Sequence, residues 1–233
     1  MSLPPPVSAR VTEGTLRDYW LARAAQHTSD SYVGVPLLKF PEDLRTYEHL
    51  LWADGPDTVI EIGTSAGGSA LWFRDRLRTF SHYGRLRRDP RVISVDASHE
   101  SARQHLASAD PEWEKSIALV EGDVRDAATI DAVAALVGDG ARCFVVEDSA
   151  HEYDTTLAAL AGFARFVPPQ GFFVVEDGCV DVAALRLTED WPHGVLPAVH
   201  DWLETSEGRR FRVRRDLELY GISCHPEGFL QRA

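Results

Sequence analysis

From Asp57 onward, short runs of apolar, β-branched residues alternate with longer segments in which apolar residues recur at helical spacing. We predict strands from the runs at 57–62, 91–96, 117–122, 142–147 and 171–176. The segments between them predict helices at 67–80, 98–109, 126–137 and 152–166. Each strand run is apolar on both faces, as in a parallel sheet covered by helices on both sides.

The alternation changes after Asp177. A helix is predicted at 195–206, followed by strand-like runs at 209–215 and 217–225 that are joined by a short polar link. Two strands with so short a connection must be antiparallel. The sequence therefore predicts an α/β fold: a doubly wound, mostly parallel seven-stranded sheet with a C-terminal antiparallel pair. By fold analogy this is the methyltransferase arrangement rather than the plain dinucleotide-binding one.

The segment ahead of the sheet predicts a separate N-terminal part. Helical periodicity covers residues 12–28 and 41–54, and Pro41 suits the first helical turn. We expect residues 1–10 to be disordered, residues 11–54 to form a helical extension that acts as a lid or in oligomerisation, and residues 55–233 to form the main domain.

Composition narrows the class of protein. The 233 residues carry a formal charge of −12, which argues against nucleic acid or anionic lipid as a partner and favours a small-molecule substrate. No apolar run approaches the roughly 20 residues that span a bilayer, and the first residues do not resemble a secretory signal. Cys143, Cys179 and Cys224 are expected to be reduced core residues, because their number and spacing suggest neither disulfides nor a zinc site. A cytoplasmic protein is expected.

A glycine-rich turn follows the first strand of the sheet. Gly63, Gly67 and Gly68 let the backbone turn sharply and approach a ligand. Ser65 stands where a dinucleotide fingerprint needs its second glycine, so a ligand with an amino acid end fits better than a pyrophosphate. The alternative is simply a tight strand-to-helix turn.

Two aspartates end the next strands. Asp96 could accept hydrogen bonds from both hydroxyls of a ribose, and Asp123 could reach an adenine amino group. Each could instead be a solvated turn residue. Their placement at successive strand ends favours the ligand interpretation, because open α/β sheets bind ligands there.

Acidic residues also end the fourth and fifth strands. Asp148, Glu176 and Asp177 should meet at one edge of the sheet, where they would repel one another unless a cation compensates them. Oxygen ligands suit Mg²⁺, with Mn²⁺ or Ca²⁺ as alternatives. The competing interpretation is that these residues cap the following helices. Glu147 is a weaker candidate, because strand alternation points it away from Asp148.

His151 follows this cluster by three residues, and its neutral imidazole could take a proton from a substrate hydroxyl. Lys39 could close over the site from the N-terminal segment, or lie in solvent. Several aromatic residues could line an acceptor pocket, although core packing is the commoner role; they are Trp20, Tyr32, Phe40, Trp191 and Trp202.

From about Tyr32 to the C-terminus the chain resembles the cephalosporin hydroxylase and 7-hydroxycephem methyltransferase-like family, which also includes rhamnosyl O-methyltransferases of natural-product pathways. The matching stretches are YVGVPLLKFPEDL, VIEIGTSAGGSALWF, VISVD, EGD, VVEDSAHEYD, FFVVEDG and LYGISCHPEGFLQR. The resemblance implies a class I methyltransferase active in antibiotic or other natural-product biosynthesis, and homo-oligomerisation as a dimer or larger assembly.

The resemblance also implies site residues. S-adenosylmethionine would be bound by Asp96, Asp123 and the loop residues Glu61, Gly63, Thr64, Ser65 and Ser69. Magnesium would be bound by Asp148, Glu176 and Asp177. Relatives often carry D-S-D-H where this chain has Ala150, so an aspartate base cannot be carried over, whereas the macrolide-sugar methyltransferases use the histidine.

The expected reaction is metal-dependent methyl transfer from S-adenosylmethionine to a hydroxyl of a small natural-product or sugar acceptor, with His151 as general base. Two alternatives stay open: a hydroxylase-like enzyme, and a non-catalytic scaffold for a biosynthetic enzyme. No 2-His-1-carboxylate iron set is readable, which weakens the first.

Overall fold

The computed structural model describes residues 14–186 and 188–233, so the expected disorder of residues 1–10 lies outside the described residues. In chain order the helices and strands are α1 (Leu16–His27), β1 (Ser31–Tyr32), β2 (Val35–Pro36), α2 (Pro41–Asp54), β3 (Thr58–Ile62), α3 (Gly68–His82), β4 (Arg91–Asp96), α4 (Glu100–Ala109), β5 (Ile117–Glu121), α5 (Ala127–Leu136), β6 (Cys143–Glu147), α6 (Tyr153–Phe163), β7 (Phe172–Val175), α7 (Val195–Leu203), β8 (Phe211–Val213) and β9 (Phe229–Arg232). Short 3-10 helices are η1 (Trp113–Lys115), η2 (Ala164–Phe166), η3 (Gly178–Asp181), η4 (Gly208–Arg210) and η5 (Arg215–Leu217).

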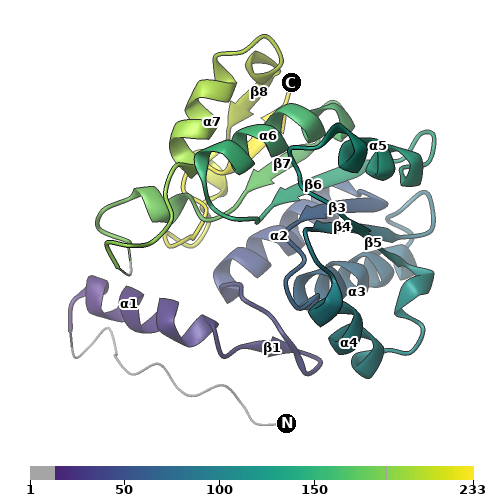
Figure 1. Cartoon of the computed structure of the whole chain (residues 1–233), viewed down its shortest axis with the longest axis horizontal. Helices are drawn as coiled ribbons and strands as arrows, with labels where there is room; N and C mark the ends of the chain where they lie inside the picture. The colour runs from purple at the N-terminus through teal and green to yellow at the C-terminus, as the bar shows by residue number, and fades with distance from the viewer. Residues whose placement is uncertain (1–13, 187) are drawn as a thin grey trace.

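Strands β3 to β9 form a seven-stranded sheet in the order β5-β4-β3-β6-β7-β9-β8 (Figure 1). Strands β3 to β7 are parallel, and β9 runs antiparallel to both β7 and β8. Ile62 of β3 is in register with Val95 of β4 and with Glu147 of β6, and Glu147 is in register with Val175 of β7. The carboxyl ends of these strands therefore meet at one edge, and the predicted fold class is confirmed.

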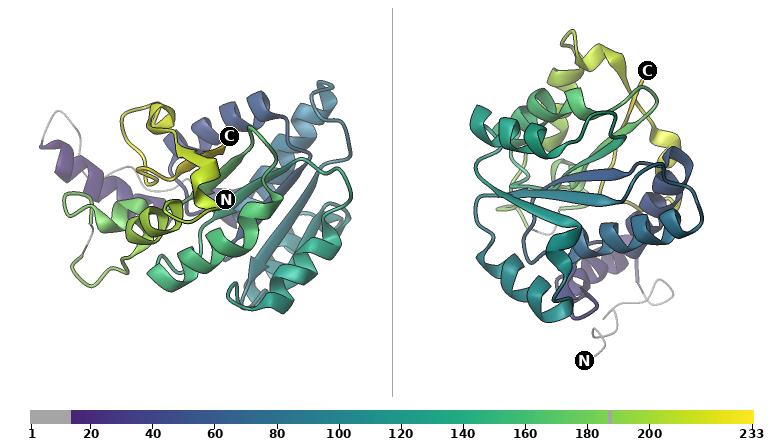
Figure 2. Two further views of the ribbon diagram at one scale, coloured as in Figure 1. Left: turned by 90° about the horizontal axis from the view of Figure 1, so that it is seen from above. Right: turned by 90° about the vertical axis from the view of Figure 1, so that its right-hand side faces the viewer.

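Helices cover both faces of this sheet, as Figure 2 shows. Alternate strand residues supply two cores: Ile60 faces a core that includes Leu160 of α6, whereas Val59 faces one that includes Leu51 of α2 and Leu77 of α3. Strand residues buried on both sides explain why the five parallel strands read as continuous apolar runs.

The second C-terminal strand was placed wrongly in the sequence prediction. The segment 217–225 forms turns rather than a strand, with Tyr220 46% exposed, and the pairing strand is β9. Gly221 has a φ of +69°, which interrupts the apolar run. At Gly228 a Cβ would lie 2.0 Å from the Val175 carbonyl oxygen, so this glycine lets the tail reach β7.

The N-terminal segment contains the two expected helices and one element that the pattern did not predict. Thr15 and Asp18 form a capping box on α1, and Pro41 occupies the first turn of α2. Between them, β1 and β2 form a two-stranded hairpin. The Trp20 indole donates to the Leu185 carbonyl at 2.6 Å, which ties α1 to the loop after η3. Within the described ranges, none of the helices has the length and apolar character to cross a bilayer.

Candidate functional site

The glycine-rich loop joins β3 to α3 in close contact with the end of β6. Gly63 has a φ of +100°, and a Cβ there would lie 1.8 Å from the Asp148 carbonyl oxygen. Gly67 adopts the left-handed conformation at the N-cap of α3. Only glycine permits this approach, so Gly63 brings the loop and the acidic segment of β6 together.

Asp96 anchors this loop from the end of β4. One carboxylate oxygen, Oδ2, accepts hydrogen bonds from the backbone N–H groups of Thr64 and Ser65, both at 2.9 Å. Among the described residues, Oδ1 receives only a long 3.4 Å contact from Ser98 N–H. Asp96 therefore orders the loop and keeps one oxygen that can accept a ligand hydroxyl.

A cavity of about 400 Å³ opens beside Asp96. Its walls come from the ends of β3, β4, β5 and β6, and include Gly63, Ser65, Asp96, Asp123 and Ser149. The predicted adenine ligand, Asp123, is held by Arg125, whose backbone N–H and Nε both donate to Oδ1 at 2.9 Å. The Arg125 guanidinium lowers the pKa of Asp123 to about 2, so the carboxylate is charged at neutral pH.

Glu61 and Thr64 were predicted to bind the cofactor, but both side chains are buried beneath the loop. Ser94 Oγ donates to Glu61 at 2.6 Å and lies 2.7 Å from the Thr64 hydroxyl, which is 2.9 Å from His99 Nε2. Burial raises the pKa of Glu61 to about 7. Ser94 and His99 form a network under the loop that the sequence analysis missed, because neither belongs to the glycine motif.

A second cavity, of about 230 Å³, shares Gly63, Ser65, Asp148 and Ser149 with the first. Its remaining walls bring in Ser69 of α3, His151, Asp177 and the segment around Lys39. The loop, the predicted base and two of the predicted metal ligands thus line two adjoining cavities.

The acidic cluster already contains a protein cation. Lys39 Nζ donates to Asp148 Oδ2 at 2.8 Å and to Glu176 Oε1 at 2.6 Å. Tyr47 Oη donates to the same Glu176 oxygen at 2.7 Å. Burial acts to lower the pKa of Lys39, but the neighbouring carboxylates raise it more, so the ammonium is charged. Lys39 does reach over the site, as one of its two predicted positions required.

His151 lies beside Asp148 and Asp177. Its Nε2 is 3.3 Å from Asp177 Oδ2. Both residues have left-handed backbones, with φ of +58° and +57°, a conformation that costs non-glycine residues about 1–3 kcal/mol each. Burial acts to lower the pKa of His151, but Asp177 and the other carboxylates raise it above the ordinary value. Such strain is typical of functional sites.

His225 from the C-terminal tail completes the cluster; it lies in the stretch LYGISCHPEGFLQR, but the sequence analysis gave it no role in the site. Its Nδ1 accepts the Asp177 backbone N–H at 3.1 Å, which leaves the proton on Nε2, 3.6 Å from Glu176 Oε2. The tail is held by Asp43, which accepts from Ser223 Oγ at 2.6 Å and from Cys224 N–H at 3.0 Å.

The donor set suits a hard divalent cation. Ligand atoms of Asp148, His151 and Asp177 lie within 4.8 Å of one another, as do those of Glu176, Asp177 and His225. Carboxylate oxygens are the ligands that Mg²⁺ and Mn²⁺ prefer. Glu147 is fully buried and hydrogen-bonded to Ser149 and Thr156, so it points away from the cluster as expected.

Most of the candidate aromatic residues belong to the core. Trp20, Phe40 and Trp202 are buried in one hydrophobic cluster, and Trp191 packs against its edge. The Tyr32 hydroxyl donates to Asp75 of α3 at 3.0 Å rather than to the carboxylates of the acidic cluster. These side chains therefore fit the interpretation as core residues better than the interpretation as the lining of an acceptor pocket.

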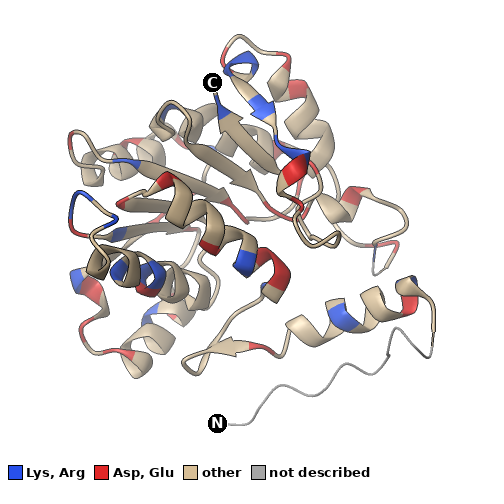
Figure 3. Cartoon of the chain, turned by 180° about the vertical axis from the view of Figure 1, so that it is seen from behind, with Lys and Arg blue, Asp and Glu red and all other residues tan. Residues whose placement is uncertain are grey.

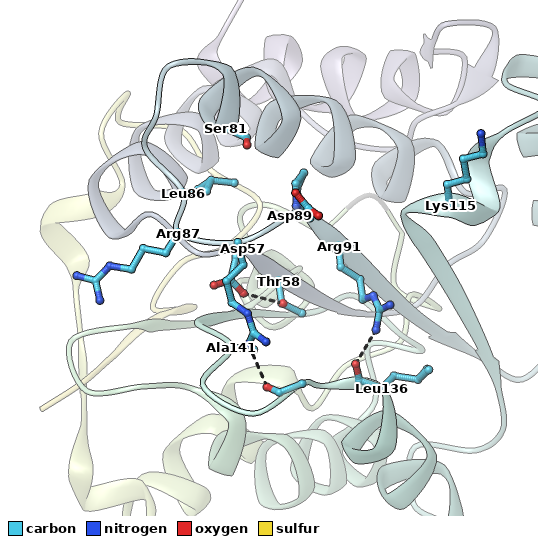
Figure 4. A pocket seen from close by; sticks show the side chains of 13 residues that line it. Asp57, Thr58, Ser81, Leu86, Arg87, Asp89, Arg91, Lys115, Leu136 and Ala141 are labelled. Atoms are coloured by element: carbon cyan, nitrogen blue, oxygen red, sulfur yellow. Dashed lines mark hydrogen bonds between the residues drawn. The ribbon is translucent and has the colours of Figure 1, made fainter.

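A larger depression, of about 760 Å³, lies at the opposite end of the strands, as Figure 4 shows. There Arg91 donates to the Leu136 carbonyl at 2.8 Å and Thr58 donates to Asp57 at 2.9 Å, while Arg87 points away. Basic residues gather on α3, on the loop after it and around β8 (Figure 3). Parallel α/β sheets bind ligands at the carboxyl ends of their strands, so size alone does not make this depression the site.

Comparisons with known proteins agree with the resemblance predicted from the sequence. The family model Rhamnosyl O-methyltransferase/CmcI matches residues 25–233. A rhamnosyl O-methyltransferase of Mycobacterium tuberculosis is 27% identical over 207 residues, which cover 88% of this chain and 79% of the relative. That of Mycobacterium leprae is 26% identical over 171 residues, covering 72% and 69%.

Solved structures share the fold. A CmcI structure with Mg and SAM has a TM-score of 0.65 at 21% identity, covering 99% of this chain and 89% of that chain. A putative caffeoyl-CoA O-methyltransferase from Staphylococcus aureus has a TM-score of 0.60 at 15% identity, covering 85% and 86%.

Proposed function

The chain belongs to the Rhamnosyl O-methyltransferase/CmcI family, and from this membership we propose metal-assisted transfer of a methyl group from S-adenosylmethionine to a sugar hydroxyl of a natural product, with His151 as general base. The class of enzyme, an S-adenosylmethionine-dependent O-methyltransferase, follows from the family and its named relatives. The metal, the base and the acceptor are the proposal.

The observation that carries the proposal is the shared wall of the two cavities. Gly63 and Asp148 line both, so a ligand beside Asp96 and an acceptor beside His151 would meet across these residues. Asp96 Oδ1 would accept from the ribose, and the loop N–H groups are already ordered by Oδ2. Holding two reactants in line supplies much of the rate of a methyl transfer.

Asp148, Glu176 and Asp177 would hold the divalent cation, which when bound supplies Lewis acidity toward the acceptor hydroxyl. His151 would remove the hydroxyl proton through Nδ1, because a proton on Nε2 that faces Asp177 at 3.3 Å orients the ring and leaves the lone pair on the other nitrogen. Only the neutral imidazole can accept a proton, so the rate should fall as the pH drops through the pKa of His151.

The test is methylation of a panel of rhamnosides and macrolide glycosides, followed by mass spectrometry. We expect His151→Ala to lower kcat by about 10²–10⁴-fold, the usual effect of a positioned base. The control is His105→Ala; the half-buried His105 ring on α4 lies 2.9 Å from the Ser101 carbonyl. A near-normal kcat for His151→Ala would contradict the assignment of the base.

Chelation tests the metal. Activity should disappear in excess chelator and return with Mg²⁺ or Mn²⁺, and full activity in chelator would refute metal assistance. A non-catalytic scaffold would show no methyl transfer in any of these assays.

Homo-oligomerisation and a cytoplasmic location stay predictions.

A further inference from the structure

Lys39 is buried against two of the three carboxylates that would bind metal. Its side chain is 2% exposed, and its ammonium lies 2.8 Å from Asp148 and 2.6 Å from Glu176. These are lengths of charge-assisted hydrogen bonds. The Glu176 side chain is also 2% exposed, so this pair is shielded from solvent, whereas Asp148 keeps 21%.

The backbone holds Lys39 in this position. Lys39 lies between β2 and α2, and the preceding Pro36 carbonyl packs so closely on the start of α3 that a Cβ on Gly68 would lie 2.0 Å from its oxygen. The following Phe40 is buried in the core. Contacts on both sides therefore deliver the ammonium into the acidic cluster.

The ammonium divides the candidate ligands into two groups. Asp148 belongs with His151 and Asp177, and Glu176 belongs with Asp177 and His225. Asp177 belongs to both groups, whereas Asp148 and Glu176 do not occur together in either group. Lys39 Nζ is bonded to both of these carboxylates, so it occupies the position between them.

We propose that Lys39 is a resident counterion that competes with a divalent cation for Asp148 and Glu176, so that metal binds all three carboxylates only when the ammonium releases at least one of them. This inference rests on the proposed metal site. It adds that the Lys39 side chain moves when the metal enters, which links metal occupancy to the wall of the second cavity.

The physical reason is charge compensation. Three carboxylates and one ammonium leave two negative charges, which attract a divalent cation. However, Oε1 of the buried Glu176 is already hydrogen-bonded to both Lys39 and Tyr47. Buried charges must be paired, so breaking these contacts opposes metal binding. Removing the ammonium removes that opposition and leaves an extra uncompensated carboxylate.

The first test is calorimetric titration of Mn²⁺ into the wild type and into Lys39→Met and Lys39→Arg. We expect Lys39→Met to bind Mn²⁺ about 10-fold or more tightly than the wild type, which corresponds to about 1.4 kcal/mol. Lys39→Arg keeps the charge and should stay close to the wild type. In Lys39→Met combined with Asp148→Asn the gain should disappear. Equal or weaker binding by Lys39→Met would overturn the proposal.

The second test uses the wild-type chain and needs no variant to fold. The sequence contains only two lysines, Lys39 and Lys115, and the Lys115 side chain is 68% exposed. Acetylation followed by peptide mass spectrometry should modify Lys115 quickly with or without Mn²⁺. Lys39 should react slowly without metal and faster with saturating Mn²⁺. A Lys39 rate that Mn²⁺ leaves unchanged would contradict the release.

The outcomes separate this inference from the proposed function. If Mn²⁺ restores methyl transfer after chelation, but neither the Lys39→Met affinity nor the Lys39 labelling changes as expected, the counterion proposal fails and metal assistance stands. If Mn²⁺ binds neither the wild type nor Lys39→Met, both fail.

Discussion

Replacing Gly63 by alanine should separate the loop from the end of β6. The new Cβ would lie 1.8 Å from the Asp148 carbonyl oxygen, against an ordinary contact of 3.4 Å or more. The backbone cannot easily move apart, because Gly63 N–H donates to Val95 at 2.8 Å and Asp148 N–H donates to Ile62 at 2.7 Å. The clash therefore falls on the hydrogen bonds that join three strand ends.

Two costs add in this variant. A φ of +100° is unfavourable for alanine by about 1–3 kcal/mol, and overpacking adds about 1–3 kcal/mol. We expect Gly63→Ala to lower the free energy of unfolding by about 2–6 kcal/mol. Gly84 offers a matched control: its φ is +71° and no heavy atom lies within 4 Å of its Cβ position, so Gly84→Ala carries the strain without the clash.

Urea denaturation measures the stability of both variants, and calorimetry with S-adenosylhomocysteine measures cofactor affinity. Gly63→Ala should lose about 10-fold or more in affinity, because the loop N–H groups held by Asp96 move with Gly63. Gly84→Ala should bind normally. If Gly63→Ala is no less stable than Gly84→Ala and binds as well as the wild type, the close approach of the loop to β6 is refuted.

Two further predictions concern the residues around the loop. Asp96→Ala should weaken S-adenosylmethionine binding by about 10-fold or more in calorimetry, because it removes the acceptor of two loop N–H groups. Each of these hydrogen bonds to a charged partner is worth about 1.5–3 kcal/mol. Unchanged binding would exclude the ribose assignment. Burial raises the folded-state pKa of Glu61 from 4.5 to about 7, so its contribution to stability is complete below about pH 4.5 and is lost as the pH rises through 7. Glu61→Gln should therefore gain stability relative to the wild type between pH 5 and pH 8, by up to about 3 kcal/mol in urea denaturation, and a pH-independent difference would contradict the raised pKa.

The parallel part of the sheet was predictable because burial on both faces leaves a signal in the local sequence. The runs ending at Ile62, Asp96 and Glu147 are strands within one residue of their predicted ends. β9 was missed because its pairing depends on Gly228 and on a return of the chain to β7, and neither has a local period. The hairpin of β1 and β2 is too short to show alternation.

The sequence predicted where the side chains at the strand ends lie better than it predicted which residues they bond to. Asp123 is paired with Arg125, two residues away, and Asp96 with the loop that precedes it. By contrast, Tyr47 of α2 and His225 of the C-terminal tail reach Glu176 across 129 and 49 positions of the chain. No spacing rule connects such residues, because the fold alone brings them together.

The acidic cluster shows what electrostatic reasoning from a sequence can and cannot specify. Repulsion between Asp148, Glu176 and Asp177 requires a compensating cation, and that requirement holds in the structure. It does not distinguish an ammonium from a metal ion, because both satisfy it. The distinction depends on where Lys39 lies, and its position is fixed by the packing of Pro36 on α3 rather than by any feature near the carboxylates. A metal site inferred from clustered carboxylates therefore has to be tested together with the basic residues that the fold brings to it.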